Sequence, residues 1–200
     1  MFYKKIKRGL DIILSIIGVL ILSPLLIIVA LAIKIDSKGP VIFKQKRLGL
    51  NGSEFNIYKF RSMCNNAEKD GVYCEKGDAR VTKIGKFIRA TSIDELPQFF
   101  NIIKGEMSII GPRPTLTYHP WKYEEYTEIQ KKRFKVRPGV TGWAQINGRK
   151  DVEWNKRIEY DIEYIEKLSF KFDAQILWKT IIKVLMMRDN FNVGETVNRK

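Results

Sequence analysis

The sequence predicts an α+β fold that is mainly helical, with a small β-hairpin and an amino-terminal helix that enters a membrane. Residues 12–33 are apolar and carry no charge, Asn51-Gly52 separates two short β-prone runs, and the carboxyl end shows a basic amphipathic pattern. We therefore expect a membrane segment over residues 1–36 and a single folded domain over residues 37–200.

The charge balance favours polyanionic partners. The chain has 36 Lys and Arg against 22 Asp and Glu, a formal charge of +14, which suits a diphosphate, anionic lipid or nucleic acid. Nucleic acid is not expected as a partner, because the basic residues are dispersed and no zinc-finger or RNP-like pattern occurs. The one histidine and two cysteines without CxxC spacing argue against a His-based triad or a zinc site. Catalytic acid, base or nucleophile must mostly come from carboxylates.

The apolar run is long enough, as one helix, to cross a hydrocarbon core of about 30 Å. It is longer than a secretory signal of about 7–15 apolar residues, and no A-x-A-like cleavage site follows it. Ser23-Pro24 lies near its middle, where proline removes a backbone hydrogen bond. Both flanks are basic, and the positive-inside rule then places both ends on the cytoplasmic face. This favours a re-entrant helix broken at Ser23-Pro24, with a kinked spanning helix as the alternative.

The next segment reads as a hairpin. The runs Val41–Lys46 and Phe55–Met63 are β-prone and are joined through Asn51-Gly52. If the second run is extended, Lys59 and Arg61 share one face, as two cations side by side. A solvated edge strand is the alternative interpretation.

Residues 84–103 read as a helix in two pieces, interrupted near Thr91-Ser92. Ser92-Ile93-Asp94-Glu95 has the S-x-x-E form of a capping box, and Pro97 suits a first helical turn. Capping alone could therefore explain the Asp94-Glu95 pair.

Two later segments also carry candidate site residues. In Gly111-Pro112-Arg113-Pro114 the prolines stiffen the backbone on both sides of Arg113. The stretch from Arg137 to Arg149 combines glycines, a tryptophan, arginines and the amides of Gln145 and Asn147, which suits a nucleotide base and phosphates. A glycine-rich turn is the alternative. The carboxyl pattern over residues 170–186 predicts an amphipathic helix that either lies at a membrane interface or packs on the core.

Together these motifs resemble those of the bacterial sugar transferases, the monotopic polyprenol-phosphate phosphoglycosyl transferases. The motifs that carry the resemblance occur in family order over residues 1 to about 150: Ser23-Pro24, Lys59-Phe60-Arg61-Ser62-Met63, Ser92-Ile93-Asp94-Glu95-Leu96-Pro97-Gln98, Gly111-Pro112-Arg113-Pro114 and Arg137-Pro138-Gly139 through Gly148-Arg149. The length matches the minimal members, and the carboxyl third resembles the family in character rather than through a motif.

The resemblance implies a re-entrant helix, Mg²⁺ as cofactor, and a cytoplasm-facing catalytic domain on the bacterial inner membrane. The implied reaction moves a sugar 1-phosphate from a UDP-sugar to undecaprenyl phosphate, releases UMP and begins assembly of a surface glycan. Asp94 and Glu95 are the expected catalytic pair, with Asp94 as nucleophile, and both are the expected carboxylates for the metal. The expected substrate- and phosphate-binding residues are Lys59, Arg61, Arg89, Arg113, Arg137, Gln145, Asn147 and Arg149.

Two alternatives stay open. A membrane-anchored basic adaptor would use the same charge to recruit acidic partners or lipid, without catalysis. Within the enzymes, the polyprenol phosphate could attack the donor directly in a ternary complex, with Asp94 only a metal ligand. The sequence is also compatible with a homo-oligomer, and it does not identify the sugar.

Overall fold

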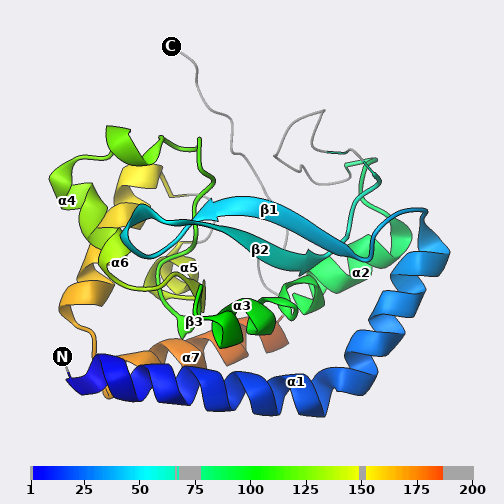
Figure 1. The fold of residues 1–200 in the computed structure, drawn as a ribbon, viewed down its shortest axis with the longest axis horizontal. Helices are drawn as coiled ribbons and strands as arrows, with labels where there is room; N and C mark the ends of the chain where they lie inside the picture. Colours follow the sequence, from blue (N-terminus) through cyan, green and yellow to red (C-terminus); the bar gives the residue numbers. More distant parts are fainter. Residues whose placement is uncertain (1, 66, 68–77, 149–151, 187–200) are drawn as a thin grey trace.

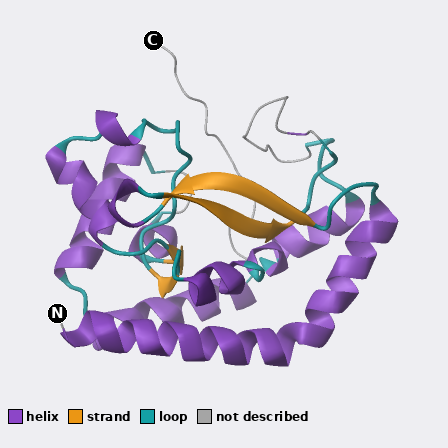
Figure 2. Cartoon of the chain, in the orientation of Figure 1, coloured by secondary structure: helices purple, strands orange, loops and turns teal. Residues whose placement is uncertain are grey.

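The computed structural model describes residues 2–65, 67, 78–148 and 152–186. In this part of the chain, helices predominate over two small two-stranded sheets (Figure 2). The helices are α1 (Phe2–Asp36), α2 (Lys83–Ala90), α3 (Gln98–Lys104), α4 (Glu128–Lys131), α5 (Trp143–Asn147), α6 (Trp154–Glu166) and α7 (Phe170–Leu185), and the strands are β1 (Ile42–Leu48), β2 (Glu54–Phe60), β3 (Ser108–Ile110) and β4 (Gly139–Thr141). The short 3-10 turns are η1 (Leu50–Gly52), η3 (Ile93–Glu95), η4 (Tyr123–Glu125) and η5 (Lys132–Lys135).

Helix α1 contains Pro24 and is bent into two segments (Figure 1). In a regular helix the carbonyl of Leu20 would accept from the N–H of residue 24, which proline lacks. The hydroxyl of Ser23 donates to that carbonyl at 2.8 Å. Pro24 thus accounts for the bend, and the Ser23 hydroxyl satisfies the Leu20 carbonyl that the proline leaves without a backbone donor.

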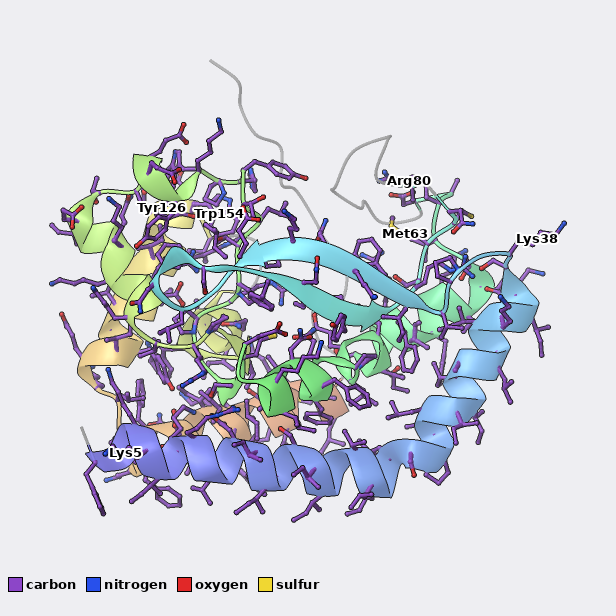
Figure 3. All side chains as sticks on the ribbon, in the orientation of Figure 1. Lys5, Lys38, Met63, Arg80, Tyr126 and Trp154 are labelled. Carbon is purple, nitrogen blue, oxygen red and sulfur yellow. The ribbon has the colours of Figure 1, made fainter. Side chains whose placement is uncertain are left out.

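α1 is also the one helix in the described part of the chain that is long and apolar enough to cross a membrane. More than half of the exposed large hydrophobic side chains of the described residues lie on it. Lys5 and Lys38 lie near its two ends (Figure 3), as the basic flanks of the sequence require.

Polar contacts fix the amino-terminal half of α1 to the rest of the protein. Arg8 donates to two carbonyls at the end of α3. The buried carboxylate of Asp11 accepts from the Ser108 hydroxyl at 2.7 Å and from the next backbone N–H of β3 at 3.1 Å. Lys7 lies 2.9 Å from the carboxylate of Asp173 on α7, and α1 and α7 run along the same side of the molecule (Figure 1).

The carboxyl-terminal half of α1 is held by apolar packing instead. Val29 and Ile33 pack with Phe60 of β2 and Ile88 of α2 in one buried cluster. Burial of side chains of this size contributes roughly 1.5–3 kcal/mol each. Phe60 and Ile88 directly adjoin Lys59 and Arg89 in the chain, so α1 packs against the segments that carry two candidate site residues.

The expected hairpin is present, with different strand bounds. β1 and β2 pair antiparallel from Ile42 opposite Phe60 to Leu48 opposite Glu54. Asn51 and Gly52 both have positive φ in the connection, as the Asn-Gly prediction requires. β2 ends at Phe60, so Arg61 leaves the strand that was predicted to extend to residue 63.

The predicted interruption of the helix is also present, but the prediction of a capping box at Ser92 is wrong. α2 ends at Ala90, the 3-10 turn η3 follows, and α3 begins after Pro97. Ser92 has φ of 58°, a left-handed conformation that is uncommon for a residue other than glycine, and its side chain makes no capping hydrogen bond. Capping by Ser92 therefore does not explain the Asp94-Glu95 pair.

A short parallel pair, β3 and β4, was not predicted. Its backbones approach closely at two glycines, because a Cβ on Gly139 would lie 2.1 Å from the Gly111 nitrogen and one on Gly142 would lie 2.1 Å from the Gly111 carbonyl oxygen. These glycines of the two sequence motifs therefore serve backbone packing, which matches the alternative interpretation of a glycine-rich turn.

Candidate active site

The two adjacent carboxylates of η3 lie against cations from two other segments. Nζ of Lys59, at the end of β2, lies 2.7 Å from Oε1 of Glu95. Nη1 of Arg113 lies 3.6 Å from the same oxygen. The Lys59 and Glu95 side chains are each only 17% exposed, so water screens this ion pair less than one on the open surface.

Asp94 is surrounded by charges of both signs. Its burial raises the pKa of the carboxyl from 3.8 to about 6, while the positive charge of Lys59 opposes this increase. The negative charge of Glu95 raises the pKa further, and Arg89 and Arg113 lower it. Burial and the charge of Glu95 together therefore outweigh the three cations. The Asp94 carboxyl thus holds a proton more tightly than an exposed aspartate does.

Arg113 is held by its backbone, as the flanking prolines predict. The Pro112 carbonyl accepts from the Gly139 N–H at 2.8 Å, and the Arg113 carbonyl accepts from Nη2 of Arg133 at 3.0 Å. The Pro114 carbonyl accepts from Arg47 at 3.2 Å. Three consecutive carbonyls are thus fixed, while the Arg113 side chain stays 47% exposed and is able to meet an anion beside Glu95.

Arg133 and Asp161 form a supporting pair that the sequence interpretation missed. Two guanidinium nitrogens of Arg133 donate to one Asp161 oxygen, at 2.7 and 3.0 Å, and both side chains are only 2% exposed. A carboxylate partner offsets the cost of burying the arginine's charge, and a buried charge left unpaired is strongly destabilising. Through Arg133 the pair also fixes the carbonyl of Arg113. No sequence pattern indicated it, because Arg133 and Asp161 are too far apart in the chain to form a local motif.

Arg61 has a different position from the one expected. Its guanidinium is buried and donates to the Ser37 carbonyl at 2.7 Å, to the Lys38 carbonyl, and to Asn65 at 3.1 Å. These carbonyls lie at the end of α1, where backbone acceptors have no partner within the helix. Arg61 is also not among the residues whose charge acts on Asp94. It closes the end of α1 and does not join the carboxylate pair.

Arg137 likewise lies apart from the pair. Its Nε donates to the Gly105 carbonyl at 2.8 Å, at the carboxyl end of α3. The carboxylates precede the other end of this seven-residue helix, which is about 10 Å long. Arg137 therefore stabilises a helix end, together with Arg8.

The remaining candidates lie on or after α5. Gln145 is buried, and neither polar atom of its amide has a hydrogen-bond partner within the described ranges. Asn147 is exposed and donates to the Trp143 carbonyl of its own helix. Arg149 lies outside the described residues. Of the eight expected binding residues, the structure thus brings Lys59, Arg89 and Arg113 to the carboxylates.

The carboxylate pair matches the donor set that Mg²⁺ prefers. This ion is usually bound through one or two carboxylates, with substrate phosphates and water completing the shell. No group of three or more His, Cys, Asp or Glu side chains that could hold a metal occurs within the described ranges. Asp94 and Glu95 fit a metal held jointly with a substrate, and not one held by protein alone.

The fold and site define a class of protein: a small domain carried on one long apolar helix, with a partly buried carboxylate pair beside three cations. The family model described as bacterial sugar transferase matches residues 2–187, and the chain belongs to this family.

Several relatives are similar over most of the chain. A UDP-glucose:undecaprenyl-phosphate glucose-1-phosphate transferase of Escherichia coli (strain K12) is 46% identical over 185 residues, 89% of this chain and 40% of that protein. A UDP-N-acetylgalactosamine-undecaprenyl-phosphate N-acetylgalactosaminephosphotransferase of Aeromonas hydrophila is 44% identical, over 92% of this chain and 44% of that protein. An uncharacterized sugar transferase of Bacillus subtilis (strain 168) is 42% identical, over 90% of this chain and 88% of that protein.

The chain thus spans less than half the length of the first two relatives and most of the third. The names of the first two agree on undecaprenyl phosphate and differ in the sugar.

Proposed function

We propose that this chain transfers a sugar 1-phosphate from a UDP-sugar to undecaprenyl phosphate and releases UMP. The observation that carries the proposal is the carboxylate pair Asp94-Glu95 beside Lys59, Arg89 and Arg113. The family membership and the names of the relatives supply the two substrates. The particular sugar stays open because those names differ in it.

Asp94 is the nucleophile of the proposed reaction. A carboxylate oxygen attacks the phosphorus that bears the sugar, and the bond from that phosphorus to the UMP oxygen breaks. UMP leaves with the bonding electrons, and an acyl phosphate joins Asp94 to the sugar. A phosphate oxygen of undecaprenyl phosphate then attacks the same phosphorus and displaces the Asp94 carboxylate. Neither displacement requires a proton, because both attacking groups are anionic oxygens.

The cations have a defined task in both displacements. Negative charge collects on the phosphoryl oxygens and on the departing UMP, and preorganised cations stabilise it best in a site of low water content. Arg113 is best placed for this role, because its backbone is fixed and its side chain is half exposed. Mg²⁺, held by Asp94 and Glu95 with the diphosphate, would neutralise further charge.

The bend in α1 supports a re-entrant topology at the cytoplasmic face of the inner membrane. The Ser23-Pro24 bend and the basic residues beyond both ends of α1 suit a helix that enters and leaves on one side. α7 carries exposed Phe170, Trp178 and Leu185 beside α1, which suits an interfacial helix. Such an arrangement sets the site at headgroup level, where the phosphate of a polyprenol lies.

Intact-protein mass spectrometry tests the proposal. The detergent-purified protein is incubated with Mg²⁺ and a panel of UDP-sugars, without polyprenol phosphate, beside Asp94→Asn and Glu95→Gln. A sugar-phosphate adduct with UMP release, absent in Asp94→Asn, is the expected result and also names the donor. UMP release that appears only after undecaprenyl phosphate is added would replace the covalent step with a ternary complex. No UMP with any donor and acceptor would favour the adaptor alternative.

A further inference from the structure

Gln98, the first residue of α3, lies about one turn after Glu95 of η3. Backbone hydrogen bonds between residues three apart occur on both sides of Gln98, from the Glu95 N–H to the Ser92 carbonyl and from the Phe99 N–H to the Leu96 carbonyl. Side chains three apart on helical turns are neighbours. Glu95 contacts Lys59 of β2, and Asn101 accepts from the Tyr58 N–H of the same strand at 2.9 Å. Gln98 is three residues from each, so it is a helical neighbour of two residues whose side chains bind β2.

The side-chain amides of Asn101 and Gln98, both on α3, differ in their hydrogen bonding. Asn101 is fully buried, and besides accepting from β2 it donates to the Asn56 carbonyl at 2.7 Å and to Glu106 at 2.6 Å. Gln98 is only 2% exposed, yet its Nε2 has no hydrogen-bond partner among the residues that the structure describes. A buried donor without a partner weakens a fold. The Asn101 amide therefore stabilises the fold, whereas the Nε2–H of Gln98 makes no such hydrogen bond to the described residues.

We infer that Gln98 is a positioning residue for Glu95 in the reaction proposed above, on which this inference rests. When the diphosphate enters, its phosphates compete for Lys59 and Arg113, the two cations that now hold Oε1 of Glu95. The Nε2–H of Gln98 then donates to the Glu95 carboxylate and fixes which oxygen faces the substrate and its cation. Partners that orient a metal-binding carboxylate act in this way, and their loss typically costs about 10- to 100-fold in activity or metal affinity.

Gln98→Met tests the inference, because methionine has a similar shape and no polar donor. Removing an unpartnered buried donor leaves the thermal midpoint equal to or above that of the wild type. The kcat for UMP release falls about 10- to 100-fold, and the Mg²⁺ concentration for half-maximal rate rises. The KM for the UDP-sugar changes by less than about twofold, because the donor acts through Glu95 and not on the sugar or base. Asn101→Leu is the matched control, and it lowers the thermal midpoint.

The other outcomes separate the two proposals. A Gln98→Met protein with wild-type kcat and Mg²⁺ dependence would overturn the inference while the proposed function stands. A midpoint that falls together with the rate, as in Asn101→Leu, would make Gln98 a structural residue and also overturn the inference. If the wild type releases no UMP from any UDP-sugar, the proposed function fails first and the inference falls with it.

Discussion

The ammonium of Lys59 lies 2.7 Å from Oε1 of Glu95, whereas Asp94, one residue earlier, has no ion pair among the described residues. Two neighbouring carboxylates therefore have different electrostatic environments. Glu95 is neutralised by a direct partner, and Asp94 is partly buried with cations that act on it from a distance. Unequal environments of this kind give two carboxylates separate roles.

The first prediction concerns the acid side of the pH–rate profile. Only ionised Asp94 can attack phosphorus, and its pKa is raised to about 6. We expect kcat/KM for UMP release to fall below pH 6 and to approach about a tenfold loss per pH unit at lower pH. Stopped assays from pH 5 to 8 would measure this, with a melting curve at each pH to exclude unfolding. A flat profile down to pH 5 would contradict the assignment.

The second prediction separates the cations by their effect on this pKa. Lys59 is the strongest of the three cations that lower the pKa of Asp94, and Arg113 is the weakest. Lys59→Met should therefore move the acid limb of the profile to higher pH, and Arg113→Met should move it less. Both variants should also be slower at the optimum, because each removes a charge that stabilises phosphoryl oxygens. Equal shifts in both variants would argue against Lys59 as the main partner.

The third prediction links the site to stability. Because the folded-state pKa of Asp94 is raised, the stability present below its ordinary pKa of 3.8 is lost as the pH rises through about 6. Asp94→Asn removes this ionisation and should stabilise the protein by roughly 1–3 kcal/mol at pH 7.5. The gain should shrink at pH 4.5. Denaturant titrations of both proteins at the two pH values would measure it, and a loss of stability at pH 7.5 would be the opposite result.

The fourth prediction compares two arginines that look alike in the sequence. Arg61→Met removes buried donors from the carbonyls at the end of α1 and should cost about 1–3 kcal/mol of stability, with little change in the KM for the UDP-sugar. Arg113→Met should change stability little and raise the KM for the UDP-sugar, because its half-exposed side chain lies beside Glu95. Melting curves and initial rates on both variants would show whether the two effects separate.

The fifth prediction concerns α1. Pro24→Ala restores an N–H that can donate to the Leu20 carbonyl, so the helix should straighten and become able to span the membrane. A cysteine placed at the amino terminus of a variant without Cys64 and Cys74 would then react with an impermeant maleimide added outside intact cells. The same cysteine with Pro24 retained should stay unlabelled. Labelling of both proteins would show that α1 spans the membrane even when bent.

Local sequence patterns predicted the local parts of the fold. The Asn51-Gly52 turn specified the hairpin, and the break at Thr91-Ser92 was visible from residue types alone. β3 and β4 were missed because each is three residues long and its partner lies about thirty residues away in the chain, too short and too distant for any period to show. Pairing across such distances is a tertiary property.

The site was predictable where a motif fixes its own geometry. The fixed backbone of Arg113 followed from its flanking prolines, and the closeness of Asp94 and Glu95 followed from their adjacency in the chain. Arg61 and Arg137 do not, because the carbonyls they bind follow the carboxyl ends of α1 and α3. Gln98 had a visible signal, since its spacing of three from Glu95 could be read from the sequence, but its unused donor could be found only from burial.

The contacts of the amino-terminal half of α1 also bear on how this protein can be prepared. Asp11 holds the strand that leads to Arg113, and Arg8 holds the end of the helix that follows Glu95. Deleting α1 to obtain a water-soluble fragment would remove the partners of the β3 and α3 groups that Asp11 and Arg8 bind. It would also expose the apolar cluster around Ile88. Crystallisation, inhibitor screening and kinetics must therefore be carried out on the intact chain in detergent or in lipid discs.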